Sequence, residues 1–512
     1  MTARERVAQL FMLGFPGPEA DLSLLDLIHQ QGLGGVIFFA RNATSPGQLR
    51  ALSEHLQDAN RLGPELPLLI AIDQEGGLVA RLNEDNGFIT PPGAMLLGAA
   101  NNPVLTHRSG AYTAAQLRQA GVNVNLAPVL DVNNNPQNPV IGVRSFGQVP
   151  EFVAQHGVAY LRGLQGGGVV AVGKHFPGHG DTSVDSHLAL PRINHPLSRL
   201  ESVELLPFRR AIGAGLMGVM TAHVTFPALA ADGRPATLSP AVLTGLLRER
   251  MGFDGLILTD CMEMKAISDN YGPGEAAVMA IEAGADLVLI SHTWERQLAA
   301  IEAVVQAVEE GRLSEARIEA SLARVYRAKR WVARACEIPP GYSELPLEAA
   351  RRGITVIRRG QPGLPLQPGR LLTVEFRGRH LTGVEEDPIK PGDLAAHLRE
   401  LLPGSTITSL LAPLVPAPRS RETIELAAAS ADLVVWLTRE AVRYPEQAQL
   451  VKGLARAKPG LGVALRTPYD ARVIPELATY LAAYDGRPTT MRALAEVLAG
   501  AVRPTGTLPV TL

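Results

Sequence analysis

Short runs of apolar residues alternate with longer stretches of helical periodicity through about the first 330 residues of the chain. This alternation is typical of parallel βα units and differs from the pattern of a β-sandwich. The apolar runs are continuous, as expected for strands that are buried on both faces. We predict strands at residues 36–39, 68–72, 122–126 with 129–130, 169–172, 218–221, 256–258 and 287–290, and an eighth at 9–14.

Eight such units predict an α/β fold of the (β/α)8 TIM-barrel type. Polar residues follow six of the predicted strands, and in a barrel these strand ends share the face that carries the active site. An open doubly wound sheet is the alternative fold. It is not favoured, because the chain has no glycine-rich dinucleotide turn with an acidic residue about 20 positions later. The polar residues at the strand ends are Asp73, Asp131, Lys174 with His175, His223, Asp260, and Ser291 with His292.

A segment rich in proline and glycine, residues 339–352, follows a predicted helix at 315–337 and is predicted as a linker. It separates a catalytic barrel, residues 1–338, from a smaller αβα domain, residues 353–512. In the second domain we predict strands at 354–357, 371–376, 433–437, 462–465 and 480–484, a helix at 421–429, and a loop at 412–419. Its polar residues at strand ends, such as Arg439 and Asp470, look like ordinary loop residues. We therefore expect this domain to pack against the barrel and to supply no catalytic group.

Composition excludes several classes of partner. The chain has 512 residues, 48 Lys and Arg, 50 Asp and Glu, and a formal net charge of −2. No basic patch is visible that would bind nucleic acid or an anionic membrane. Two cysteines, Cys261 and Cys336, cannot form a disulfide framework or a thiolate metal site, and we interpret Cys261 as a packing residue. We expect a cytoplasmic protein without a signal peptide or membrane span. The sequence makes no prediction of oligomeric state.

The densest polar cluster is the loop from Lys174 to His187, KHFPGHGDTSVDSH. A simple polar turn does not need three histidines and a lysine. A metal site is one alternative, with ligands that include His175, His179, Asp181, Asp185 and His187. In a turn, the spacing of Asp185 and His187 also lets the carboxylate accept from the imidazole N–H and fix its tautomer, which makes His187 a candidate proton shuttle.

Asp260 follows the apolar strand 256–258 directly. One interpretation is that it caps a following helix, since CMEMKAI has a helical pattern. The other is a nucleophile on the rim of the barrel, facing the anomeric carbon of a sugar as in retaining glycosidases.

Five motifs resemble those of glycoside hydrolase family 3, and specifically those of its β-N-acetylglucosaminidase branch. They occur along this chain in the order that is typical of the family. The end of the chain, from Tyr484, is similar to the close of that family's second domain, so the resemblance covers most of the chain. The Asp185-Ser186-His187 segment is the most discriminating, because most of the wider family uses a carboxylic acid as proton donor. The motifs are DQEGG from Asp73 with Arg81, NLAPVLDV from Asn125, RSFG from Arg144, the 174–187 loop, and LTD ending at Asp260.

The resemblance implies Asp260 as the nucleophile, His187 as the acid/base and Asp185 as its partner. Sugar binding would fall to five further residues. An imidazole with an ordinary pKa of about 6.5 suits both proton transfers of a retaining mechanism. No role is assigned to His179, Asp181, His223 or His292. The sugar-binding residues would be Asp73, Arg81, Arg144, Lys174 and His175.

The expected function is a retaining exo-β-N-acetylglucosaminidase acting on muropeptide or chitin-type oligosaccharides. A cytoplasmic location favours cell-wall recycling. We expect no cofactor and no metal, and a small oligosaccharide as the partner. A glycosyl phosphorylase is an alternative on the same site, because a neutral imidazole repels incoming phosphate less than a carboxylate does. A metal-dependent hydrolase and a silent sugar-binding protein are the others.

Overall fold

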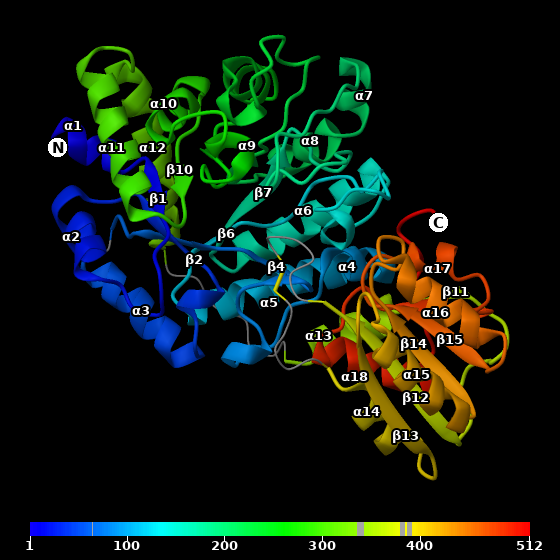
Figure 1. Ribbon diagram of the computed structural model, residues 1–512. Coiled ribbons are helices and arrows are strands. Elements are labelled where there is room, and N and C mark those ends of the chain that lie inside the picture. Colours follow the sequence, from blue (N-terminus) through cyan, green and yellow to red (C-terminus); the bar gives the residue numbers. More distant parts are fainter. Residues whose placement is uncertain (64, 335–342, 379–384, 387–391) are drawn as a thin grey trace.

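Eight parallel strands surround a barrel axis in the N-terminal part of the computed structural model (Figure 1). The structure describes residues 1–63, 65–334, 343–378, 385–386 and 392–512. Cys336 and the end of the predicted helix 315–337 lie outside these ranges. The strands are β1 (Phe11–Leu13), β2 (Gly35–Phe38), β3 (Leu69–Ile72), β6 (Val124–Asn125), β7 (Val170–Phe176), β8 (Gly218–Thr221), β9 (Leu256–Leu258) and β10 (Val288–Ile290).

The strands follow one another around the barrel in chain order, and β10 pairs with β1. A parallel bridge between Leu258 and Leu287 brings β9 to the start of β10. Every residue of these eight strands is buried, which explains their continuous apolar runs. The predicted barrel is confirmed.

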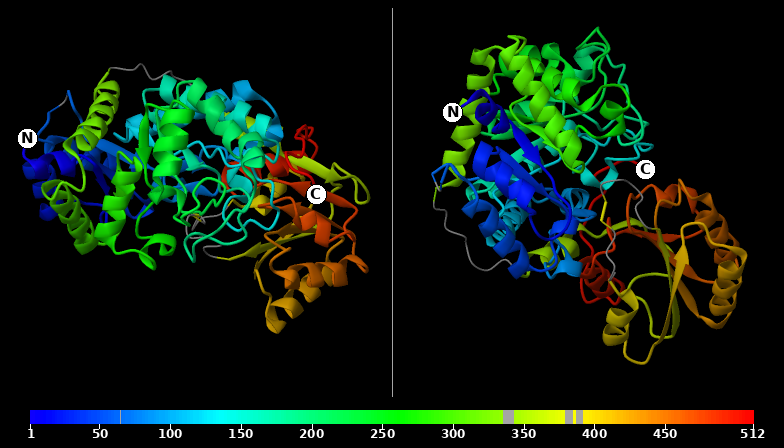
Figure 2. Two further views of the ribbon diagram at one scale, coloured as in Figure 1. Left: turned by 90° about the horizontal axis from the view of Figure 1, so that it is seen from above. Right: turned by 60° about the vertical axis from the view of Figure 1, so that its left-hand side comes forward.

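Helices cover the outside of the barrel (Figures 1 and 2). Local sequence sets their starts: Ser45, for example, caps the N-terminus of α3, and a proline occupies its first turn. A short antiparallel pair, β4 (Gln74–Gly76) and β5 (Val79–Ala80), extends beyond β3. The helices are α1 (Ala3–Ala8), α2 (Leu22–Gln31), α3 (Pro46–Asp58), α4 (Ala94–Ala100), α5 (Pro103–Gln119), α6 (Pro150–Gly166), α7 (Leu197–Ser202), α8 (Leu205–Gly213), α9 (Lys265–Ser268), α10 (Pro273–Ala283), α11 (Trp294–Glu309) and α12 (Glu315–Val332), with a π-helix at Ala241–Arg250 and 3-10 turns at Ala40–Asn42, Glu84–Asn86, Gly142–Arg144 and Ala236–Leu238.

A six-stranded sheet in the order β11-β16-β15-β14-β12-β13 forms the second domain, and only β11 runs antiparallel to its neighbour. Helices pack on both faces, because alternate strand residues enter two separate apolar clusters: Val435 and Leu437 join one, Val434 and Trp436 the other. The elements are α13 (Leu345–Gly353), β11 (Thr355–Arg358), β12 (Arg370–Arg377), α14 (Leu394–Leu401), β13 (Thr406–Pro413), α15 (Pro418–Ser430), β14 (Leu433–Thr438), α16 (Pro445–Ala455), β15 (Gly460–Ala464), α17 (Asp470–Val473), β16 (Thr479–Ala482) and α18 (Pro488–Leu498).

The two domains share an apolar interface. Leu78, Met95 and Leu96 of the barrel join the same cluster as the β14–β16 face of the second sheet. The segment 339–352, predicted as a linker, includes most of helix α13, which packs on α4 and α18. The domain boundaries stay a prediction. No helix in the described ranges has the length and apolarity needed to cross a bilayer.

Candidate active site

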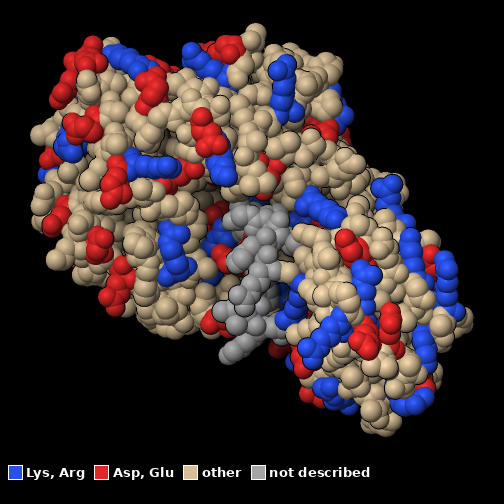
Figure 3. All heavy atoms as spheres, viewed as in Figure 1, with Lys and Arg blue, Asp and Glu red and all other residues tan. Residues whose placement is uncertain are grey.

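A pocket of about 570 Å³ opens at the carboxyl ends of the barrel strands. Seven of the eight predicted site residues line it, and the eighth, Asp185, bonds directly to one of them. Around the pocket, on the molecular face drawn in Figure 3, acidic and basic side chains are interspersed and neither sign of charge forms a large patch. The seven are Asp73, Arg81, Arg144, Lys174, His175, His187 and Asp260.

The floor of the pocket is a network of ion pairs. Lys174 Nζ lies 2.6 Å from Asp73 Oδ1 and 2.7 Å from Glu75 Oε1. Arg144 donates two hydrogen bonds to Glu75, at 2.8 and 2.9 Å. Burial raises the pKa of Asp73 and Glu75, but the neighbouring cations more than offset this, so both pKa values lie below the ordinary range. The network holds both carboxylates ionised and fixes the cations in place.

His175 is held against the floor by a buried carboxylate. Its Nδ1 lies 2.7 Å from Asp131 Oδ2, while its Nε2 lies 3.5 Å from Arg144 Nη2. Asp131 also accepts from the backbone N–H of His179 at 2.6 Å. Because Asp131 follows β6, this bond ties the loop after β7 to the end of the neighbouring strand. The sequence places Asp131 at a strand end, and the structure adds its role of positioning His175.

The Asp185–His187 pair adopts the geometry expected from its spacing. Asp185 Oδ1 accepts from the backbone N–H of His187 at 2.9 Å and lies 2.7 Å from His187 Nδ1. Burial raises the pKa of Asp185, but its bonds to His187 lower it below the ordinary value, so the carboxylate stays ionised. Nε2 is therefore the ring nitrogen of His187 available for proton exchange.

Asp260 does not cap a helix. Met264 occupies the N-cap position of α9, and the Asp260 carboxylate accepts from the backbone N–H of Cys261 at 2.7 Å. Burial raises the pKa of Asp260, but His223, His175 and His187 together lower it below the ordinary value. The site thus presents an ionised carboxylate to the pocket.

The histidine-rich loop does not gather the metal-ligand set considered from the sequence. His179 contacts Thr182 and Ser186, and Asp181 lies 2.6 Å from His195. Over the described ranges, the groups able to hold an ion are Asp181–His195–Glu204 and Cys261–Glu263–His292, and each contains at most one member of that set.

Two acidic wall residues that pair with predicted site residues were missed by sequence reasoning. Glu75 lies two positions after Asp73, a spacing that places both on one side of an extended segment and that could have revealed it. Glu386 belongs to the second domain, lines the pocket, and pairs with Arg81 Nη1 at 2.8 Å. The second domain therefore does more than pack against the barrel, since its chain reaches the pocket wall beside β5, and the expectation that it supplies no catalytic group stays a prediction. Arg81 Nη2 also lies 3.5 Å from Asp73 Oδ2.

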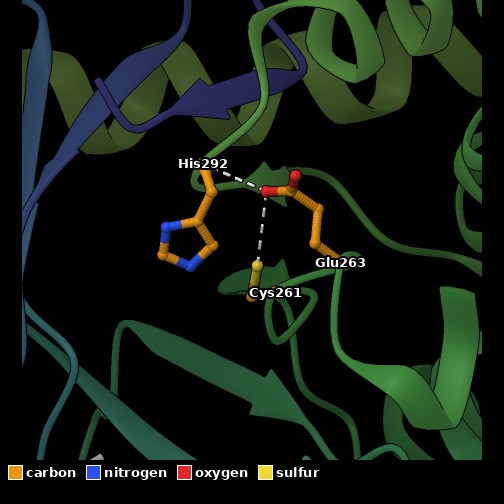
Figure 4. A group of neighbouring side chains, drawn as sticks. All are labelled: Cys261, Glu263 and His292. Carbon is orange, nitrogen blue, oxygen red and sulfur yellow. Dashed lines mark hydrogen bonds between the residues drawn. The ribbon is translucent and has the colours of Figure 1, made fainter. Parts of the chain in front are cut away.

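Cys261 also lies in the pocket wall, together with Glu263 and His292 (Figure 4). It is half-buried, so the packing role that the sequence indicated does not account for its place in the pocket wall. Glu263 accepts from the backbone N–H groups of Ser291, His292 and Thr293 at 2.6–3.0 Å, just before α11 begins. These bonds join the loop after β9 to the loop after β10.

Comparisons with known proteins agree with this architecture. Residues 2–328 match the model of the glycosyl hydrolase family 3 N-terminal domain. Beta-hexosaminidase A of Pseudoalteromonas piscicida is 35% identical over 72% of this chain, which spans 62% of that relative's length. A beta-hexosaminidase of Alkalilimnicola ehrlichii is 39% identical over 54% of this chain and 79% of its own length.

Solved structures cover the whole chain. A glycoside hydrolase family 3 beta-N-acetylglucosaminidase from a Paenibacillus species is 42% identical, with a TM-score of 0.93 over 100% of this chain and 99% of its own. A beta-glucoside phosphorylase has a TM-score of 0.82 over 100% of this chain and 94% of its own, at 23% identity, which reflects the shared fold.

Proposed function

Because the chain belongs to glycoside hydrolase family 3 and is a glycoside hydrolase, we propose that it removes terminal β-linked N-acetylglucosamine with retention of configuration. One observation supports this most: an ionised carboxylate, Asp260, and a carboxylate-bound imidazole, His187, line the same pocket. A retaining glycosidase needs one group to attack and another to transfer protons.

In the first step, the Asp260 carboxylate attacks the anomeric carbon and forms a covalent glycosyl–enzyme. His187, in its protonated form, donates its Nε2 proton to the departing glycosidic oxygen. Asp185 holds Nδ1–H and stabilises the charge on the ring, so it positions the acid and does not itself touch the substrate.

In the second step, the now neutral His187 accepts a proton from water, and the water oxygen attacks the anomeric carbon. The bond to Asp260 breaks, free N-acetylglucosamine leaves with its β configuration, and His187 regains its proton. One group can serve both steps, because imidazole exchanges protons near neutral pH.

The ion-pair network of the floor is the proposed sugar subsite. Asp73 accepts hydrogen bonds from sugar hydroxyls, and Lys174, Arg144, Arg81 and His175 donate to sugar oxygens. Carboxylates already neutralise Lys174, Arg144 and Arg81, so the subsite suits a neutral sugar.

The rim of the pocket differs from the floor in that its cations are not neutralised by carboxylates of the described residues. Arg41 and Lys265 are exposed and line the pocket, and within the described ranges neither pairs with a carboxylate. Arg41 instead donates to the carbonyl oxygens of Phe15 and Ser291 at 2.9 and 2.7 Å. We propose that they receive an anionic leaving sugar, which favours acidic muropeptide fragments over neutral chitooligosaccharides and a role in cell-wall recycling, in the cytoplasm.

The deciding experiment compares products from a chromogenic β-N-acetylglucosaminide in phosphate buffer and in phosphate-free buffer. Free N-acetylglucosamine in both supports hydrolysis, whereas the sugar 1-phosphate would indicate a phosphorylase. Absence of any product would indicate a binding protein. Loss of activity in chelator, restored by a divalent ion, would indicate a metal-dependent hydrolase. The natural substrate follows from kcat/KM on a muropeptide disaccharide and on chitobiose.

A further inference from the structure

Three side chains of different chemistry converge in the pocket wall beside Asp260. Atoms of Cys261, Glu263 and His292 that could ligate a metal all lie within 4.8 Å of one another. Cys261 Sγ lies 4.0 Å from Glu263 Oε2, and Figure 4 shows both atoms near the imidazole of His292. The residues come from the ends of neighbouring strands, β9 and β10, so closure of the barrel brings them together.

The donor set is selective. A thiolate, an imidazole and a carboxylate are ligands of Zn²⁺ and similar borderline-soft cations, whereas Mg²⁺ and Ca²⁺ prefer oxygen alone. Glu263 is already fixed by three backbone N–H bonds, and a carboxylate has about four lone-pair positions, so it can still accept a cation.

The geometry also allows access. All three residues line the pocket, so a cation can enter from solvent and keep a fourth position for water. Metal bonds of about 2.0–2.3 Å place tetrahedral ligands about 3.3–3.6 Å apart. Because the ligand atoms now lie within 4.8 Å of one another, the three side chains need to close by up to about 1.5 Å.

We propose that Cys261, Glu263 and His292 form a Zn²⁺ site that inhibits the enzyme by occupying the pocket beside Asp260. On binding, the S–H bond of Cys261 breaks, its proton passes to solvent, and a Zn–S bond replaces one water ligand of the ion. The thiolate and the Glu263 carboxylate balance the charge of the ion, while His292 binds as neutral imidazole. The inhibitory effect rests on the proposed function, but the binding does not.

Binding is tested first without any assay of activity. Co²⁺ added to the full-length protein should give the near-ultraviolet thiolate-to-cobalt charge-transfer band with one ion bound per chain. Cys261→Ser should abolish the band, and His292→Ala should weaken Co²⁺ binding at least about 10-fold. Absence of the band in the wild type would overturn the proposal, even if the enzyme is active on another substrate.

Inhibition is tested next, with each variant normalised to its own rate without metal. Zn²⁺ should raise the apparent KM of the wild type, and the concentration for half inhibition should rise at least about 10-fold in Cys261→Ser and His292→Ala. His195→Ala is the matched control, because it disrupts the other metal-capable group, Asp181–His195–Glu204, and should leave Zn²⁺ inhibition unchanged. Mg²⁺ should not inhibit. Equal inhibition of wild type and Cys261→Ser, or relief by His195→Ala alone, would overturn the proposal.

Discussion

The carboxylate of Asp260 has no helix to cap, and its observed hydrogen bond comes from the backbone of Cys261. Replacing it should therefore affect chemistry far more than folding. We predict that Asp260→Asn lowers kcat by at least about 1,000-fold without changing the thermal midpoint. Steady-state kinetics and calorimetry of both proteins check this. A variant that keeps near-normal kcat would exclude Asp260 as the nucleophile.

His187 has a separate kinetic signature. We predict that His187→Ala slows glycosides with poor leaving groups far more than activated aryl glycosides, since only the former need protonation. Rates on a series of leaving groups of different pKa measure this. Asp185→Asn is the companion variant: it keeps the shape of the pair and should show a weaker form of the same trend. Equal losses across the series would indicate a binding role for His187.

Helix α6 carries a histidine outside the pocket, His156, whose role is structural. His156 is fully buried, stacks 5.6 Å from Phe146, and contacts Thr106 Oγ1 at 2.8 Å. Burial lowers its pKa from 6.5 to about 4. Between these pH values the unfolded chain binds a proton that the folded chain does not, so stability falls as pH falls from 6.5 to 4.

We predict that this histidine alone contributes about 3 kcal/mol to that loss of unfolding free energy. His156→Leu removes the titrating group, so its unfolding free energy should fall less steeply over the same pH range. Denaturant titrations at several pH values give both slopes. Identical slopes would mean that His156 becomes protonated in the folded protein.

Strands differ in how far the sequence reveals them. The barrel strands were predictable, because burial on both faces makes them continuously apolar. Strand β13 was missed, and its last two residues fall in the segment predicted as a loop. It lies at the edge of the second sheet, where only Ile407 and Ala412 are buried, so its apolar signal is weak.

At the scale of the whole molecule, the contact between Glu386 and Arg81 joins the two domains at the pocket. We predict that Glu386→Ala lowers kcat/KM about 10-fold, because Arg81 loses a partner that holds it beside Asp73. Asp432→Ala is the control: it removes an exposed ion pair with Arg370 in the same domain and should leave kcat/KM unchanged. Equal effects of the two substitutions would contradict a specific role for Glu386.

This contact also marks where sequence reasoning ends. Lys174 and His175 belong to the end of β7, which runs four residues beyond the predicted strand 169–172, and Asp185 lies in the loop after it. Asp260 follows a clear strand, so local patterns identified all four residues. Glu386 is 305 residues from Arg81 along the chain. Its place in the pocket depends on how two apolar surfaces dock, and no local pattern carries that information. The same holds for His292, which meets Cys261 only because the barrel closes.

Because cations are paired in the floor and, in the described part of the chain, unpaired with carboxylates at the rim, we predict that substrate choice depends on ionic strength. At about 0.1 M salt, exposed charges are screened beyond about 10 Å, whereas buried pairs are screened much less. Added salt should therefore raise KM for substrates with an acidic leaving sugar and leave KM for neutral ones nearly unchanged. Arg41→Ala should remove most of that salt dependence, which kinetics at increasing sodium chloride would reveal. An enzyme of this kind discriminates between charged and neutral substrates most sharply in dilute solution.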